Sequence, residues 1–172
     1  MYRILLFALL SSLGLVGCGS DETDTAEEVT PTLPKSGDWT IVTTGYSNDD
    51  CNADGFLIPF DEISIADVDT SSFSITYYLE NVRIGESSSS CSHVGDDIFD
   101  CSEIAHSTPF SSNATINMTA VGSVTMISET SISGAGNLVL DCTGADCPSV
   151  AAMTTTGSLP CDTTLNWTAT AE

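Results

Sequence analysis

The sequence predicts an all-β domain, an antiparallel β-barrel or sandwich of about 8–10 short strands held together by disulfides. Apolar residues alternate with period two over most of residues 37–172, most clearly in 73–79 and 165–169. No segment shows three turns of helical periodicity, and the composition is rich in the Thr, Ser, Ile and Val that strands favour. Six cysteines in the same part of the chain supply the covalent framework.

The expected strands are bounded by the Gly, Asn, Asp and Ser residues that favour turns. They are 39–46, 55–60, 62–68, 73–79, 89–94, 98–106, 114–120, 123–128, 137–142 and 165–169. The alternation slips between Leu79 and Val82, which predicts a bulge or turn near Glu80. Cys51 and Cys161 lie near the two ends of the domain, which favours neighbouring first and last strands and therefore a closed barrel.

The six domain cysteines are expected to form three disulfides, because an even count in an exported chain is typical of a structural framework. A three-residue hairpin loop at 95–97 would pair Val94 with Ile98 and, counting outward, Cys91 with Cys101. Opposed residues in a hairpin have Cα atoms about 4.5–5.5 Å apart, within disulfide reach. We therefore expect a Cys91–Cys101 bond.

The other two disulfides follow from loop size and elimination. Cys142 and Cys147 flank a short loop containing Gly144, which can close on itself, and the remaining pair is Cys51–Cys161. A zinc or redox site is the rival interpretation, but the spacings contain no C-x-x-C and no zinc-ribbon pattern. Structural disulfides are the expected use of these residues.

The N-terminus has the three-part layout of an export signal: a positive Arg3, an apolar stretch over 4–16, and the small residues Gly17 and Cys18. Thirteen helical residues extend roughly 20 Å at about 1.5 Å each, whereas a spanning helix must cross about 30 Å of hydrocarbon. The stretch therefore predicts a signal peptide over 1–17 and not a transmembrane anchor.

The run Leu15-Val16-Gly17-Cys18 resembles the lipobox of bacterial lipoproteins. The resemblance implies that Cys18 becomes the mature N-terminus, with diacylglycerol on its sulfur and an acyl chain such as palmitate on its amine. Gly19 and Ser20 follow where an Asp would mark inner-membrane retention, so the resemblance implies the outer membrane, on its periplasmic or surface face. A Gram-positive host would place it on the only membrane, and an ordinary secretory signal is the alternative interpretation.

Beyond the lipobox, residues 18–36 form an acidic tract containing Thr and Pro, which we interpret as a tether, and 37–172 as a single β domain. That domain has 19 acidic residues against the single basic Arg83, a formal charge of −18. Such a surface repels phosphate backbones, so a nucleic-acid partner is not expected. The simplest interpretation of the acidic charge is that it keeps the protein soluble. Binding of a cationic partner or of divalent ions is the alternative interpretation.

One segment resembles the start of an EF-hand calcium loop. Its candidate ligands, in chain order, are Asp50, Asn52, Asp54, Phe56 and Asp61. Gly55 would permit the sharp turn that such a loop requires. Against calcium, Asp61 replaces the usual Glu and the flanks predict strands, so a plain acidic turn is the alternative.

No hydrolase, nucleotide-binding or metalloprotease motif occurs in the sequence, and no catalytic residue is assigned. Two histidines, His93 and His106, flank the 95–97 hairpin without a convincing nucleophile partner. We expect a non-enzymatic binding or interaction module, lipid-anchored at the bacterial cell envelope, with no resident cofactor except possible calcium. The alternatives are a lipocalin-like carrier of a small molecule, a calcium-dependent adhesion or scaffold module, and a hydrolase that uses paired carboxylates.

Overall fold

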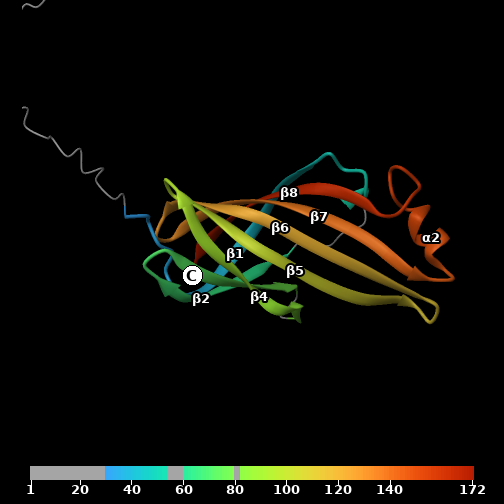
Figure 1. The fold of residues 1–172 in the computed structure, drawn as a ribbon, viewed down its shortest axis with the longest axis horizontal. Helices are drawn as coiled ribbons and strands as arrows, with labels where there is room; N and C mark the ends of the chain where they lie inside the picture. The colour runs from blue at the N-terminus through green and yellow to red at the C-terminus, as the bar shows by residue number, and fades with distance from the viewer. Residues whose placement is uncertain (1–29, 54–59, 80–81) are drawn as a thin grey trace, which may run out of the picture.

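The computed structural model describes residues 30–53, 60–79 and 82–172, which form eight antiparallel strands closed into one barrel (Figure 1). Each strand pairs with the next along the chain, and the last pairs with the first. The elements are β1 (Gly37–Ser47), β2 (Glu62–Asp69), β3 (Ser72–Leu79), β4 (Val82–Gly95), β5 (Ile98–Ser111), β6 (Ala114–Ser128), β7 (Ser131–Gly144), the short helix α2 (Cys147–Ala151) and β8 (Cys161–Ala171).

The all-β class is confirmed, and the barrel is the form it takes. The predicted adjacency of the first and last strands is also correct, because β1 and β8 pair from Trp39 opposite Ala171 to Ser47 opposite Thr164. The predicted turn at 80–81 and residues 55–59 of the predicted strand 55–60 lie outside the described residues, although Leu79 pairs with Val82. Phe60 precedes β2 and lies in no strand.

Several strands are longer than the alternation predicts, since β4 begins at Val82, β5 runs to Ser111 and β7 begins at Ser131. The two strands expected at 114–120 and 123–128 are one strand, β6. The expectation of a break failed because Gly122 is a close-approach glycine inside a continuous ladder. A Cβ at Gly122 would meet the carbonyl oxygen of Ala135 and lie 2.7 Å from the Cα of Gly136.

Glycine therefore lets β6 and β7 bend closely against each other, as barrel closure requires. Gly122 and Gly136 face each other directly in the β6–β7 register. Two positions along β7, Gly134 lies opposite Trp167 of β8, and a Cβ there would overlap the indole ring. The indole ring of Trp167 thus occupies the space that a side chain at position 134 would need.

The barrel interior is filled by the inward-facing side chains of the alternating strands. Its buried core is made by residues of all eight strands, and the largest wholly buried side chains are Trp39, Phe73, Phe99, Ile63, Ile65, Ile75 and Ile132. Phe73 and Phe99 are in contact, with ring centroids 4.9 Å apart. A second, smaller cluster contains Cys51, Leu140 and Cys161.

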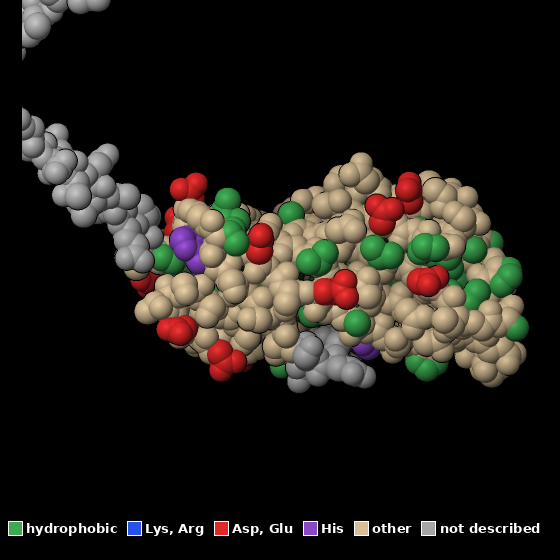
Figure 2. Space-filling model, viewed as in Figure 1, with side chains coloured by type: hydrophobic (Ala, Val, Ile, Leu, Met, Phe, Trp, Pro, Cys, Tyr) green, Lys and Arg blue, Asp and Glu red, His purple; other side chains and the backbone are tan. Residues whose placement is uncertain are grey.

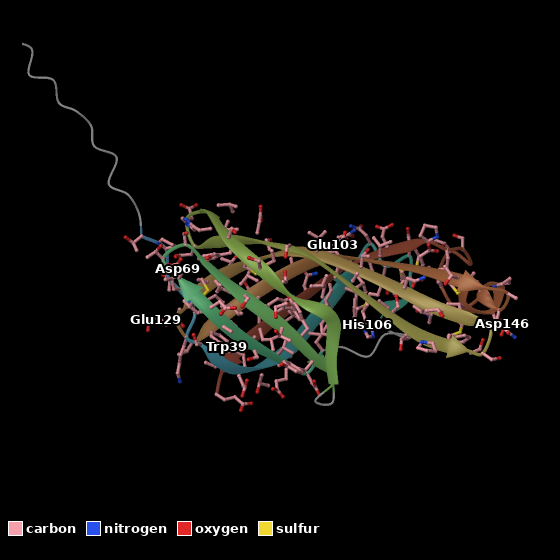
Figure 3. The ribbon with its side chains drawn as sticks, turned by 60° about the horizontal axis from the view of Figure 1, so that its bottom comes forward. Trp39, Asp69, Glu103, His106, Glu129 and Asp146 are labelled. Carbon is pink, nitrogen blue, oxygen red and sulfur yellow. A yellow bond between two sulfur atoms is a disulfide. The ribbon has the colours of Figure 1, made fainter. Side chains whose placement is uncertain are left out.

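The two ends of the barrel differ in what covers them. At the proximal end, which we define by Trp39, Asp69 and Glu129, the chain arrives from the N-terminus and β8 ends (Figures 1 and 3). At the distal end lie α2 and Asp146 (Figures 1 and 3). This arrangement follows from the up-and-down order, since an even number of strands brings both termini to one end.

The last residues of the segment interpreted as a tether contact the proximal end. The amide of Thr32 donates to Oδ1 of Asp97 at 2.8 Å, and the amide of Lys35 donates to the carbonyl of Glu129 at 2.8 Å. Leu33 packs against the core, and Nε1 of Trp39 donates to the carbonyl of Lys35 at 3.0 Å. The chain is therefore fixed to the barrel several residues before β1 begins.

Gly134→Ala is expected to destabilise the barrel by about 1–3 kcal/mol, because the added methyl overlaps the ring of Trp167. Urea unfolding followed by tryptophan emission measures this loss. Ala135→Ser is the matched control on the same strand, since the side chain of Ala135 is exposed, and it is expected to change stability by less than about 0.5 kcal/mol. Equal stability of the two variants would contradict the packing of Trp167 on Gly134.

Candidate functional site

The three disulfides join the pairs that the sequence predicts. The Cα atoms are 5.2 Å apart in Cys51–Cys161, 3.9 Å in Cys91–Cys101 and 5.7 Å in Cys142–Cys147. Two of the three lie toward the distal end, where they fix the segments between strands. Cys51–Cys161 joins the segment after β1 to the start of β8, and Cys142–Cys147 joins β7 to α2.

The tip of the β4–β5 hairpin differs from the predicted three-residue loop. Gly95, not Val94, pairs with Ile98, and the register shifts between His93 and Gly95. Asp96 adopts a positive φ of 49°, which suits the tight turn that remains. The bulge leaves the Cys91 and Cys101 pairing intact and turns Val94 outward, with 58% of its surface exposed.

The distal end is braced by hydrogen bonds as well as by disulfides. Oγ of Ser111, at the end of β5, donates to Oδ2 of Asp146 at 2.7 Å, and so holds the loop before α2. On the other side the amide of Thr155 donates to the carbonyl of Asp50 at 3.0 Å. Sequence reasoning missed these links because they join residues far apart in the chain with no motif to mark them.

Two large apolar side chains stand exposed at this braced end. Phe110 of β5 is 42% exposed and Met153, just after α2, is 38% exposed. The amide Nδ2 of Asn52 donates to the carbonyl of Met153 at 3.2 Å, which fixes the backbone there. We call the surface formed by Phe110, α2 and Met153 the distal face. It combines a backbone braced by disulfides and hydrogen bonds with exposed apolar side chains.

The predicted calcium ligands are only partly placed. Asp50 and Asn52 lie beside the Cys51–Cys161 bond, whereas Asp54 and Phe56 lie outside the described residues. Asp61 is exposed directly before β2, with its amide donating to the carbonyl of Tyr78 at 3.3 Å. Among 30–53, 60–79 and 82–172, no group of three or more His, Cys, Asp or Glu side chains is arranged to hold a metal. The calcium loop stays a prediction.

The barrel interior contains a cavity of about 40 Å³ in the middle of the barrel. Its wall includes Tyr77, Ser89 and Trp167. The ring of Tyr77 lies 5.1 Å from that of Phe60 and 6.4 Å from that of Trp167, and burial raises the pKa of its hydroxyl. The buried Ser89 donates to the carbonyl of Ser102 at 2.6 Å. The space suffices for a few water molecules.

The two histidines lie apart on the barrel. His93 is near the proximal end, with its Nε2 2.6 Å from the carbonyl oxygen of Asp96 and its ring 5.3 Å from that of Phe99. His106 lies well along β5, away from the proximal residues (Figure 3). The carboxylate of Asp97 accepts the amide of Thr32, as described above. The contacts of His93 and Asp97 position the backbone of the hairpin tip and of the incoming chain.

Comparison of the chain with protein-family models, with curated proteins and with solved structures gives no match. In the part of the chain that the structure describes, no helix has the length and apolar character needed to cross a membrane. Function must therefore be argued from the residues and their geometry.

Removing the distal disulfides is expected to destabilise the protein unequally. The Cys51–Cys161 bond spans 110 positions and Cys142–Cys147 spans five, so the chain-entropy model predicts losses of about 5 and about 2 kcal/mol. Paired alanine substitutions at each bond, measured by urea unfolding without reductant, test this ranking. A smaller loss for the Cys51 pair than for the Cys142 pair would contradict the role of Cys51–Cys161 in bracing the barrel.

Proposed function

We propose that the protein is a lipid-anchored lipoprotein of the bacterial cell envelope that acts as a non-enzymatic binding module through its distal face. The observation that carries the proposal is that the start of β1 and the end of β8 lie at the opposite end of the barrel from the distal face (Figure 1). Twelve positions separate Cys18 from Thr30, so a lipid on Cys18 stays within about 40 Å of the proximal end. The distal face then points away from the membrane.

The anchor in this proposal rests on the lipobox resemblance of Leu15 to Cys18. Two or three acyl chains give stable membrane attachment, because each buried CH₂ contributes about 0.8 kcal/mol. The closed barrel is a suitable body for such an anchor, since each strand pairs with a neighbour on both sides over part of its length, which limits unwanted pairing of strand edges. The outer membrane, with the domain on its periplasmic or surface face, is the proposed location.

The small volume of the barrel interior favours a binding module over a carrier that encloses a small molecule. Ligand pockets usually enclose about 300–1,000 Å³, whereas the barrel cavity measures about 40 Å³. The apolar side chains that the barrel exposes at its distal end, Phe110 and Met153, are instead available to a partner protein or ligand from outside. The acidic surface favours a partner that carries positive charge.

The proposal is tested in cells by two changes to the full chain. Cys18→Ser is expected to move the protein from the membrane fraction to the soluble fraction, because it removes the acylated thiol. A photoreactive residue at Met153 is expected to give discrete cross-linked adducts. The matched control is the same residue at Val42 on β1, which is 58% exposed but lies on the barrel wall, and which is expected to give none.

Two results would contradict this function. Membrane retention of the Cys18→Ser variant would remove the lipid anchor from the proposal. Equal cross-linking at Val42 and Met153, or cross-linking only at Val42, would remove the distal face as the binding surface. Thermal unfolding of each variant serves as the folding control. A midpoint near that of the unmodified protein shows that the barrel has folded.

A further inference from the structure

We propose that an apolar patch at the proximal end, formed by Val94, Ile98 and Ile127, contacts the surface of a zwitterionic lipid bilayer. The inference rests on the lipid anchor proposed above and adds a second contact, made by the folded domain itself. It would fix the orientation of the barrel on the membrane. An anchored domain without this contact would be free to tilt.

The patch is defined by its exposure and by the strand register. Val94, Ile98 and Ile127 are 58%, 38% and 64% exposed, among the most exposed large apolar residues that the structure describes. Val94 is the bulge residue next to the pairing of Gly95 with Ile98. Ile98 pairs with Thr125, and Ile127 follows two positions later on β6, so it lies diagonally across from Ile98.

Local backbone contacts hold the patch together. The amide of Met126 donates to the carbonyl of Asp97 at 2.8 Å, which ties β6 to the tip of the β4–β5 hairpin. The register of β6 and β7 shifts between Met126 and Ser128, so Ile127 is a bulge residue, as Val94 is on β4. Bulges redirect side chains, and here both turn an aliphatic side chain outward while Met126 stays buried.

The position of the patch relative to the incoming chain identifies the membrane as its partner. The amide of Thr32 donates to Asp97, in the turn between Val94 and Ile98. The chain from the proposed anchor thus reaches the barrel directly beside the patch. The anchor lies within about 40 Å of Thr30, so the tether keeps the bilayer within reach of the patch. The effective concentration of lipid at the patch is therefore high.

The acidic side chains around the patch favour zwitterionic over anionic lipid head groups. Asp96, Asp97 and Asp100 belong to the same hairpin, and Glu129 lies in the next proximal turn. Figure 2 shows acidic side chains and hydrophobic ones close together at the proximal end. Carboxylates repel anionic head groups, so contact is expected with a zwitterionic surface and is weakened by anionic lipid.

The test places a tryptophan in the patch of the full, lipidated chain. Ile127→Trp is reconstituted in phosphatidylcholine vesicles whose acyl chains carry bromine, a short-range quencher of tryptophan. The matched control is Val121→Trp, on the same strand and 48% exposed, about 20 Å away along the strand and therefore about 15 Å farther from the proximal end along the barrel axis. The native Trp39 and Trp167 are buried and give a constant background.

The emission added by Ile127→Trp is expected to shift to the blue and to fall by about half or more with brominated lipid, as for a side chain inserted about 5–10 Å into the interface. The Val121→Trp emission is expected to stay unchanged. Replacing a third of the lipid with phosphatidylglycerol is expected to reduce the Ile127→Trp quenching.

Absence of quenching at position 127 in vesicles that float with the protein would overturn the membrane contact while leaving the anchor intact. A blue shift without quenching would also overturn it, because a second copy of the chain would then cover the patch. If neither variant floats with the vesicles, the lipid anchor itself fails, and this inference fails with it.

Discussion

The pairing of β1 with β8 is the interaction on which the rest of the structure depends. It runs from Trp39 opposite Ala171 to Ser47 opposite Thr164, with one bulge between Thr43 and Gly45. The even number of up-and-down strands brings the start of β1 and the end of β8 to the proximal end and leaves α2 and the distal disulfides at the other end. The β1–β8 pairing joins these two strands side by side, so that one closed body separates the proposed anchor from the proposed binding surface.

Closure also explains why side chains fill the barrel interior. Eight strands leave space just wide enough for inward side chains, and here Trp39, Trp167 and the Phe73–Phe99 pair occupy it. The glycines at 122, 134 and 136 allow the strands and the Trp167 ring to approach closely. The interior cavity measures about 40 Å³, and a second hollow of about 300 Å³ is lined by residues that include Thr44, Thr125 and Thr168. The proposed function places the partner at the distal face.

The sequence predicted those features that depend on local pattern. Alternation with period two and the absence of helical runs indicated an antiparallel barrel or sandwich, and the positions of Cys51 and Cys161 favoured the closed form. Cysteine spacing and elimination indicated all three disulfides. The continuity of β6 through Gly122 could not be predicted, since the glycine is required by Ala135 on another strand. The same holds for Leu33, Phe110 and the outward turn of Val94, whose environments depend on bulges and on contacts between distant segments.

The central claim is that the barrel stands on the membrane by its proximal end, with the distal face outermost. Energy transfer from a donor attached at Met153 to an acceptor in the lipid head groups measures this height in the lipidated protein. The 15 residues of β6 extend about 50 Å, which at the usual strand tilt gives about 35–40 Å along the barrel axis. Weak transfer from Met153 and strong transfer from a donor at Glu129 is the predicted result. Equal transfer from both positions would contradict the upright orientation.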